Sequence, residues 1–448
     1  MKKLFIILSL VLMAGVFLSA CGEAAPPAPP EPPGPAAQDP VSEAEPAGRE
    51  IELVFLSRAS IAEAPHIFQA VDDFNAANEG RIRVIGDHIA DEQANLDRLR
   101  TGFATGNPPN IFHGYGGSRE VEYARHGLLF DWDEEIATDT EWSGRFLNLW
   151  DKWQYPDFPG TFGVPYEMVA STLFINSAIF EELGLDAPVT IEDFERVCAI
   201  LLENGYIPMA LGARDVWRTG HLFNFLVLKS MGVEGRDRLA DRSLSYDSPE
   251  VRRLVQMIYD WNQRGYFGPN AVSVDYNQEQ ALFFEGRAAM RFDGSWNIGV
   301  KSNSPVADVT VPVPFPYIDE RFKTSRFGNA VGLSVTMHED PDVVAASVEF
   351  VKFMSSEDFF VLNYTLRGGQ LLPAIVDEAR IRDVPVSPIF SQFYSIINLG
   401  TEFSDDIQTY DPIPALLDIV RGSLQGLFVG QNVDDFVDAV MEEIRVRS

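Results

Sequence analysis

The sequence has 448 residues, of which 46% are hydrophobic and 12% aromatic, and its formal net charge is −31. This length exceeds one typical domain and fits two lobes, while the apolar content excludes a disordered chain. The negative charge argues against nucleic acid, and against an anionic membrane surface, as partners of the folded body, because both attract Lys and Arg.

The amino-terminal segment has the features of a secretory signal. Two lysines precede an apolar run over residues 4–18, which is too short and wrongly flanked for an ordinary membrane-spanning helix. The run ends in Leu-Ser-Ala-Cys at 18–21, which resembles the bacterial lipobox. This resemblance implies that residues 1–20 are a lipoprotein signal peptide and that Cys21 is lipidated with more than one acyl chain. The alternative is a plain secretory signal with an incidental cysteine.

Residues 21–49 begin with that cysteine and continue as a Pro-, Ala- and Glu-rich stretch. Such a stretch extends as polyproline II at roughly 3 Å per residue and acts as a semi-rigid spacer. We therefore expect a tether that holds the folded body off the membrane.

The second cysteine, Cys198, lies in a helical pattern of apolar residues and is expected to be buried and inert. One further thiol cannot build a disulfide framework. The sequence contains no metal-binding, nucleotide-binding or serine-hydrolase motif. We therefore expect no cofactor and no metal.

The folded body begins with alternating strands and helices. Residues 51–56 are predicted to form a buried strand, and residues 81–85 and 110–113 the next two strands. Apolar residues at helical spacing after Pro65, and again around Leu99, predict a helix between each pair of strands. This alternation predicts right-handed crossovers and a parallel sheet.

Further along the chain, Thr190 and Asp193 form a capping-box pattern at the start of a helix. Near residue 286 a helix ends in a Gly-Arg turn, and an apolar strand over 288–292 follows, with Asp-Gly-Ser-Trp after it. Trp296 is thereby presented at the carboxyl end of a strand, where open α/β sheets bind ligands. The alternative is a buried strand with a core tryptophan.

Several stretches resemble the family-one extracellular solute-binding proteins, the sugar-capturing lipoproteins of ABC importers. They occur in the family's order over about residues 50–445. The chain departs from the family pattern at Asn110, Phe174 and Ile191, where the family usually has Asp, Tyr and Trp. The matching stretches are Val-Pro-Tyr at 164–166, Phe-Glu-Glu-Leu-Gly-Leu at 180–185, Gly-Arg-Ala-Ala-Met at 286–290, Gly-Ser-Trp at 294–296, Phe-Val-Lys-Phe-Met at 350–354 and Gly-Gln-Leu-Leu-Pro-Ala at 369–374.

The resemblance implies an α/β, two-lobed, periplasmic-binding-protein-like fold, with hinge crossovers and a ligand cleft between the lobes. Lobe 1 is expected to comprise residues 50–163 plus about 328–375. Lobe 2 is expected to comprise residues 164–327 plus about 376–448.

Sugars need flat aromatic faces and planar polar groups, and the resemblance implies which side chains supply them. Trp217 and Trp296 are expected to form the stacking platform. Tyr115 and Tyr166 are further stacking candidates, although Tyr166 could instead brace the hinge. For every candidate the alternative is a structural role in the core or in an ion pair. The polar candidates are Ser57, Arg58, Glu167, Arg214, Asp215, Asp293, Asn329 and Arg367.

The resemblance further implies capture of a mono- or oligosaccharide by hinge closure and its delivery to an ABC permease. The protein is expected to be a monomer, anchored by lipid outside the cytoplasm, and not an enzyme. One alternative is a surface glycan-binding or sensor-coupled lipoprotein without transport. Another is a tethered glycoside hydrolase, which requires two facing carboxylates. Polyols, glycerol phosphate and peptides stay open as ligands.

Overall fold

The computed structural model describes residues 49–147 and 149–447, except for the side chain of Asn329. The predicted signal peptide, the lipidation of Cys21 and nearly all of the predicted tether lie outside the described residues. Within the described part of the chain, no helix is long and apolar enough to cross a membrane.

The described residues form a mixed sheet of nine strands. β1 pairs in parallel with β2 and with β3, which confirms the parallel crossovers predicted for the start of the folded body. β10 then joins antiparallel to β3 and to β6, and the sheet continues through β8 to β7. The strands are β1 (Ile51–Ser57), β2 (Ile82–His88), β3 (Ile111–Gly114), β6 (Val164–Asn176), β7 (Ile207–Met209), β8 (Ala288–Gly294), β9 (Thr310–Val313, on β6), β10 (Ser325–Val335) and β11 (Glu402–Ser404, on β10).

Two helices make the first crossovers. α1 (Pro65–Ala77) begins with proline. Proline suits the first turn, because an amide hydrogen there would have no partner within the helix and proline has none. α2 (Glu92–Thr105) is capped by Asp91, whose carboxylate accepts a hydrogen bond from the Ala94 amide at 2.8 Å. Both helices lie where the apolar spacing predicts them.

The first apolar core lies around β1, β2 and β3. It is built by Phe55 and Ile111 from the sheet and by Phe350 from α12 (Pro341–Met354), together with residues of α1 and α13 (Glu357–Leu366). Trp132 and Trp142 also pack here.

The second apolar core lies around β7, β8 and β9. Cys198 is fully buried in it, as predicted. The predicted capping box is present, because the Asp193 amide donates to Thr190 Oγ1 and the Thr190 amide donates to Asp193. The helices of this core are α7 (Ile191–Glu203), α8 (Val216–Ala240), α9 (Pro249–Gln263), α16 (Leu416–Gly426) and α17 (Val433–Arg447).

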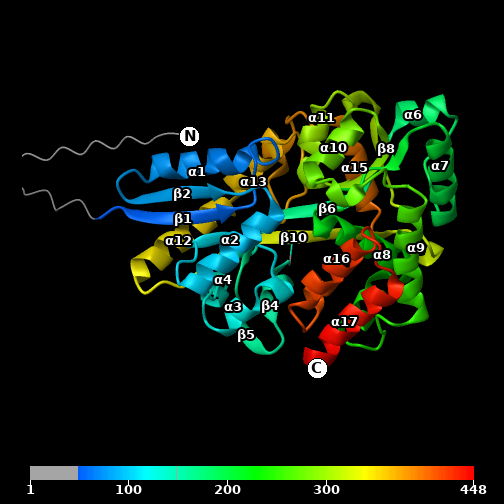
Figure 1. Cartoon of the computed structure of the whole chain (residues 1–448). Helices are drawn as coiled ribbons and strands as arrows, with labels where there is room; N and C mark the ends of the chain where they lie inside the picture. The colour runs from blue at the N-terminus through cyan, green and yellow to red at the C-terminus, as the bar shows by residue number, and fades with distance from the viewer. Residues whose placement is uncertain (1–48, 148, 448) are drawn as a thin grey trace, which may run out of the picture. The chain divides into compact units, whose positions relative to one another are not determined.

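The long strands β6 and β10 connect the two cores, and Figure 1 shows them running across the middle between the helices of each. Val164 and Leu333 belong to the first core, whereas Leu173 and Phe327 belong to the second. The pairing of β6 with β10 shifts by one residue between Val331 and Gly332, which is a β-bulge. The fold is thus two-lobed, with two strands passing from one lobe to the other.

The remaining elements cover the ends of the sheet or link its strands. A smaller apolar cluster includes Phe174, Phe283 and Phe393. The elements are α3 (Val121–Arg125), α4 (Asp133–Thr138), α5 (Thr140–Ser143), α6 (Ser177–Glu182), α10 (Tyr276–Phe284), α11 (Ile298–Ser302), α14 (Glu378–Ile381), α15 (Pro388–Asn398), β4 (Gln154–Tyr155), β5 (Phe158–Thr161) and the 3₁₀ turns η1 (Gly117–Arg119), η2 (Trp150–Trp153), η3 (Ala271–Ser273), η4 (Ser295–Asn297), η5 (Ala307–Val309), η6 (Glu320–Phe322) and η7 (Ile407–Tyr410).

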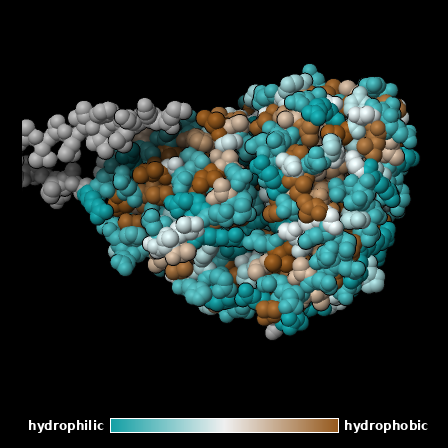
Figure 2. Space-filling view, in the orientation of Figure 1, coloured by the Kyte–Doolittle hydropathy of each residue, from teal (hydrophilic) through white to brown (hydrophobic). Residues whose placement is uncertain are grey.

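The face of the molecule in Figure 2 is mostly hydrophilic, with apolar residues in small separate patches. This agrees with the acidic composition, which favours solubility.

Candidate functional site

A cavity lies over the middle of β6 and β10, between the two cores. Its floor is formed by Val169 and Ser171 of β6 and by Phe327 and Gly328 of β10. About 80 Å³ of it is open to the centre of a water molecule. The cavity therefore sits where the chain passes from one core to the other.

Two indoles form one wall of this cavity. Trp217 is in the first turn of α8 and Trp296 lies in η4, directly after β8, and both line the cavity. Their ring centroids are 6.4 Å apart and the rings are inclined by 68°. Trp217 is largely buried, whereas part of Trp296 is accessible. The wall therefore offers aromatic surface to a ligand.

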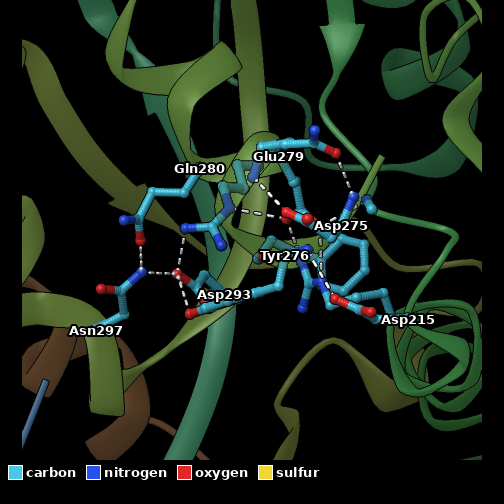
Figure 3. A network of polar contacts seen from close by, with 12 residues as sticks. Asp215, Asp275, Tyr276, Glu279, Gln280, Asp293 and Asn297 are labelled. Atoms are coloured by element: carbon cyan, nitrogen blue, oxygen red, sulfur yellow. Dashed lines mark hydrogen bonds and ion pairs between the residues drawn. The ribbon is translucent and has the colours of Figure 1, made fainter. Parts of the chain in front are cut away.

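The indole wall rests on a buried network of charges, which Figure 3 shows from close by. Trp296 Nε1 donates to the Tyr276 hydroxyl at 2.9 Å, and that hydroxyl donates to Asp293 at 3.1 Å. Asp293 also accepts from Arg291 at 2.6 Å and from Lys301. Because every one of these charges has an opposite partner, the cost of burying them is largely offset.

Burial and neighbouring charges act in opposite directions on the acid–base groups of this network. Burial alone would raise the pKa of Asp293, but Arg291, Lys301 and Arg218 outweigh it and hold that pKa below its usual range. Burial lowers the pKa of Lys301 to about 8, although Asp293 acts to raise it. At neutral pH the network therefore holds a carboxylate against a largely protonated lysine.

A chain of ion pairs closes another side of the cavity. Arg119 of η1 lies 3.0 Å from Glu92 of α2. Glu92 lies 3.1 Å from Arg421 of α16, which also contacts Asp406 at 2.7 Å. These pairs join η1 and α2, which lie in the predicted lobe 1, to α16, which lies in the predicted lobe 2.

Glu167 of β6 and Arg367, just after α13, form a second charged group. Their side chains are 2.6 Å apart, and Arg367 also donates to the backbone oxygen of Trp296 at 2.9 Å. Burial would raise the pKa of Glu167, but Arg367 and His66 lower it to about 2. The carboxylate is thus ionised at all physiological pH values.

Two neutral imidazoles complete the lining. Burial lowers the pKa of His113 to about 4, and its Nδ1 lies 2.6 Å from the Tyr166 hydroxyl. Burial also lowers the pKa of His221 to about 3. Neutral imidazole both donates and accepts hydrogen bonds, so each ring can contact a hydroxyl-rich molecule.

The structure brings six of the predicted binding residues into the cavity lining: Trp217, Trp296, Tyr115, Arg58, Glu167 and Arg367. Two others, Arg214 and Asp215, line an adjoining cavity that also contains Arg58 and Trp217.

Three predicted residues lie elsewhere. Tyr166 is fully buried in the first core, and its hydroxyl contacts His113 rather than the cavity. Ser57 is fully buried with its Oγ 2.6 Å from His88 Nδ1. Asp293 is fully buried behind Trp296, because its strand directs it into the charged network. Asn329 belongs to β10, but its side chain lies outside the described residues.

Sequence reasoning missed several polar and charged residues of the lining, above all Glu92, Arg119, His221, Asp406 and Arg421. Arg421 had a usable signal. It interrupts the apolar stripe of α16, in which Leu417, Val420 and Leu424 are buried. A charged residue on an apolar helix face indicates a buried partner.

The arrangement combines aromatic faces, guanidinium forks and carboxylates. These are the surfaces that bind hydroxyl-rich rings, since each vicinal hydroxyl can donate to a carboxylate and accept from arginine. Within the described residues, no group of His, Cys, Asp and Glu is placed to hold a metal ion.

Comparison with known proteins identifies related chains. The sequence profile of the bacterial extracellular solute-binding proteins matches residues 67–358, more than half of the chain. The chain is 20% identical over 305 residues to the multiple sugar-binding protein of Streptococcus mutans, over 65% of this chain and 68% of that protein. It is 23% identical over 304 residues to the maltotriose-binding protein of Pyrococcus abyssi, over 66% and 61%.

A third relative is an uncharacterised extracellular-binding protein of an ABC transporter from Pyrococcus horikoshii, 24% identical over 227 residues. The match covers 48% of this chain and 49% of that protein, so the chain spans about half the length of this relative.

Solved structures share the fold. A chitin oligosaccharide binding protein superposes with a TM-score of 0.79 at 21% identity, over 89% of this chain and 99% of that one. A solute-binding protein of Thermotoga lettingae, solved with α-D-tagatose, gives a TM-score of 0.71 at 17% identity, over 89% and 100%. These likenesses establish the two-lobed α/β fold.

Proposed function

The chain belongs to the bacterial extracellular solute-binding proteins, and from that premise we propose that it captures a carbohydrate outside the cytoplasm and delivers it to the permease of an ABC importer. The names of its relatives support this, because they describe sugar-binding and maltotriose-binding proteins. The proposed ligand is a mono- or oligosaccharide.

The observation that carries the proposal is the placement of Trp217 and Trp296 in one cavity with Glu167 and Arg367. Indole faces pack against the C–H faces of a sugar ring, while carboxylate and guanidinium groups pair with its hydroxyls. Nothing in this binding mode makes or breaks a covalent bond.

Capture would proceed by closure of two lobes, which we place at residues 50–163 plus about 328–375 and 164–327 plus about 376–448. β6 and β10 would serve as the hinge, because they contribute to both cores. A ligand that contacts both lobes stabilises the closed form and shifts the equilibrium toward it. The closed form would then dock on the permease as a monomer.

The proposed anchor is a lipid-modified Cys21 after removal of residues 1–20, followed by the Pro-rich tether. The Leu-Ser-Ala-Cys sequence at 18–21 supports this. Expression of the whole chain in a bacterium fed an alkyne fatty acid should give a labelled membrane protein. A Cys21→Ser variant should be unlabelled and released, and equal labelling of both would rule out this anchor.

The sugar-binding proposal is tested by thermal unfolding against a panel of neutral and acidic sugars. A ligand at 100 times its Kd raises the free energy of unfolding by ~2.7 kcal/mol, which shows as a higher melting temperature. Uptake of the same sugar should stop when the gene is deleted. Chromatography of the sugar after incubation should show it unchanged, and a panel with no stabilising sugar would refute the proposal.

A further inference from the structure

One guanidinium in the cavity has no protein partner. Arg58 follows β1, is partly buried and lines both the central cavity and the adjoining one. Among the described residues it makes no hydrogen bond and no ion pair. Its guanidinium carbon lies 5.8 Å from the centroid of the Trp217 ring.

The other arginines of the central cavity are paired. Arg367 contacts Glu167, and Arg421 contacts both Glu92 and Asp406. Arg119 shares Glu92 with Arg421. The carboxylates of Glu167, Glu92 and Asp406 therefore pair with the other three arginines of the cavity. Arg58 is left without a carboxylate partner.

The remaining acid of the lining is Glu63. It is partly exposed and lies where three cavities meet. It forms no ion pair with Arg58, although its charge and that of Glu92 act on the Arg58 guanidinium through space. At such a wet position its field is screened more than that of a buried group.

Arg58 keeps its two terminal donor nitrogens accessible to a ligand. Its Nε is buried without a partner, while the two terminal nitrogens are neither buried nor bonded. They therefore face the volume that a ligand would fill. A guanidinium withdrawn from water without an anion is costly, and a carboxylate relieves that cost with two parallel hydrogen bonds.

We propose that the cavity takes a sugar ring that carries a carboxylate, a uronic acid, and that Arg58 binds this carboxylate beside the indole of Trp217. This inference rests on the proposed function. It assigns the ligand's charge, which neither the fold nor the names of relatives decide. Arginine also binds phosphate esters through two parallel hydrogen bonds, so phosphorylated sugars are a separate outcome of the test.

Arg58 and Trp217 line both the central cavity and the adjoining one. The adjoining cavity is also lined by Asp91, Asp215 and Asp275, whose carboxylates repel an anion, so a second ring that extended into it would be a neutral one.

The test compares sugars that differ only at C6. Glucuronate is compared with glucose, and galacturonate with galactose, by titration calorimetry on the purified protein. We expect one uronate to bind at least tenfold more tightly than its neutral counterpart. Arg58→Gln should remove this preference, and Arg58→Lys should keep a part of it, because lysine keeps the charge without the fork.

The matched control is Arg98→Gln, which removes an arginine of α2 that pairs with Asp87 at 3.0 Å and does not line the cavity. It should leave the affinity for the uronate unchanged. Melting temperatures show which variants are folded. If Arg58→Gln does not fold, the uronate preference of Arg58→Lys tests the proposal instead.

The outcomes separate the two proposals. Neutral sugars that bind as tightly as uronates overturn the carboxylate site but leave sugar binding standing. Sugar phosphates or sulfates that bind more tightly than uronates also overturn it. If no sugar of the panel binds, the proposed function fails and this inference fails with it.

Discussion

Trp296 Nε1 donates a hydrogen bond to the Tyr276 hydroxyl at 2.9 Å. Tyr276 therefore holds the indole of Trp296 in the cavity wall through a hydrogen bond and not through ring stacking. The same hydroxyl donates to Asp293, which Arg291 and Lys301 hold ionised. The orientation of the exposed indole is thus fixed from behind by a buried carboxylate.

Removing this hydroxyl should loosen the indole. We expect Tyr276→Phe to weaken sugar binding roughly fivefold to tenfold, which corresponds to about 1 kcal/mol for one hydrogen bond. Calorimetry measures the loss, and the tryptophan fluorescence of the free protein should change as well. Tyr394→Phe, at an exposed tyrosine of α15, is the control and should change neither. An unchanged affinity in Tyr276→Phe would show that Trp296 does not depend on this bond.

The indole itself should matter more. Trp296→Ala removes aromatic surface that would lie against a sugar ring, and we expect at least a hundredfold loss of affinity, or about 3 kcal/mol. Part of Trp296 is exposed, so the melting temperature of the free variant should fall little. Phe403→Ala, at an exposed aromatic of β11, should bind as the unmodified protein does. Equal affinities for all three proteins would contradict a stacking role.

The ion pairs that Arg421 forms between the proposed lobes should govern closure. Arg421→Met leaves Asp406 and Glu92 buried without this partner, and breaking a buried pair costs about 3 kcal/mol or more. We expect a lower melting temperature and a larger radius of gyration by small-angle scattering.

Arg100→Gln is the matched control for this prediction. Arg100 pairs with Asp418 of the same helix α16 at 2.7 Å, but both side chains are about half exposed. Exposed pairs contribute at most about 1 kcal/mol. A radius of gyration that changes equally in both variants would contradict a specific role for Arg421.

Stability should fall on acidification below pH 6.5. Burial lowers the pKa of His113 to about 4 from an ordinary value of 6.5. Between these values the unfolded chain binds a proton that the folded protein refuses, so the free energy of unfolding decreases as pH falls. The decrease attributable to this imidazole reaches up to about 3 kcal/mol by pH 4.

The variant His113→Asn should reduce the slope of this part of the profile, measured by urea unfolding at pH 7, 6, 5 and 4, while buried His221 keeps the rest of it. His126→Asn removes an exposed histidine and should leave the profile unchanged. Below pH 4.5 a further loss sets in, because the pKa of Glu167 is lowered to about 2 and its protonation then destabilises the fold. A wild-type profile that is level from pH 7 to pH 4.5 would contradict the assignment for His113, and one that is level below pH 4.5 would contradict that for Glu167.

Much of the fold follows from local patterns in the sequence. The buried strand at 51–57, the proline that opens α1 and the capping box at Thr190 each specify an element through short-range chemistry. The collinear resemblance over the chain is confirmed by the profile match to residues 67–358. The lobe boundaries stay a prediction.

The site is less predictable, because its charged residues come from distant segments. Glu92 and Arg421 are 329 positions apart and meet only through the packing of α2 beside α16. Asp293, by contrast, was predicted to contact the ligand but does not line the cavity. Its place after a strand suggested a ligand contact, but the alternation of side chains along β8 directs it toward Arg291 and Lys301 instead.

The bulge of β10 between Val331 and Gly332 lies directly beside Glu167, because Glu167 of β6 is the pairing partner of Val331. A bulge bends its strand and increases the local twist. Under the proposed closure, with β6 and β10 as the hinge, Glu167 would lie beside this bend, so a ligand held by Glu167 would contact the protein close to the centre of the rotation.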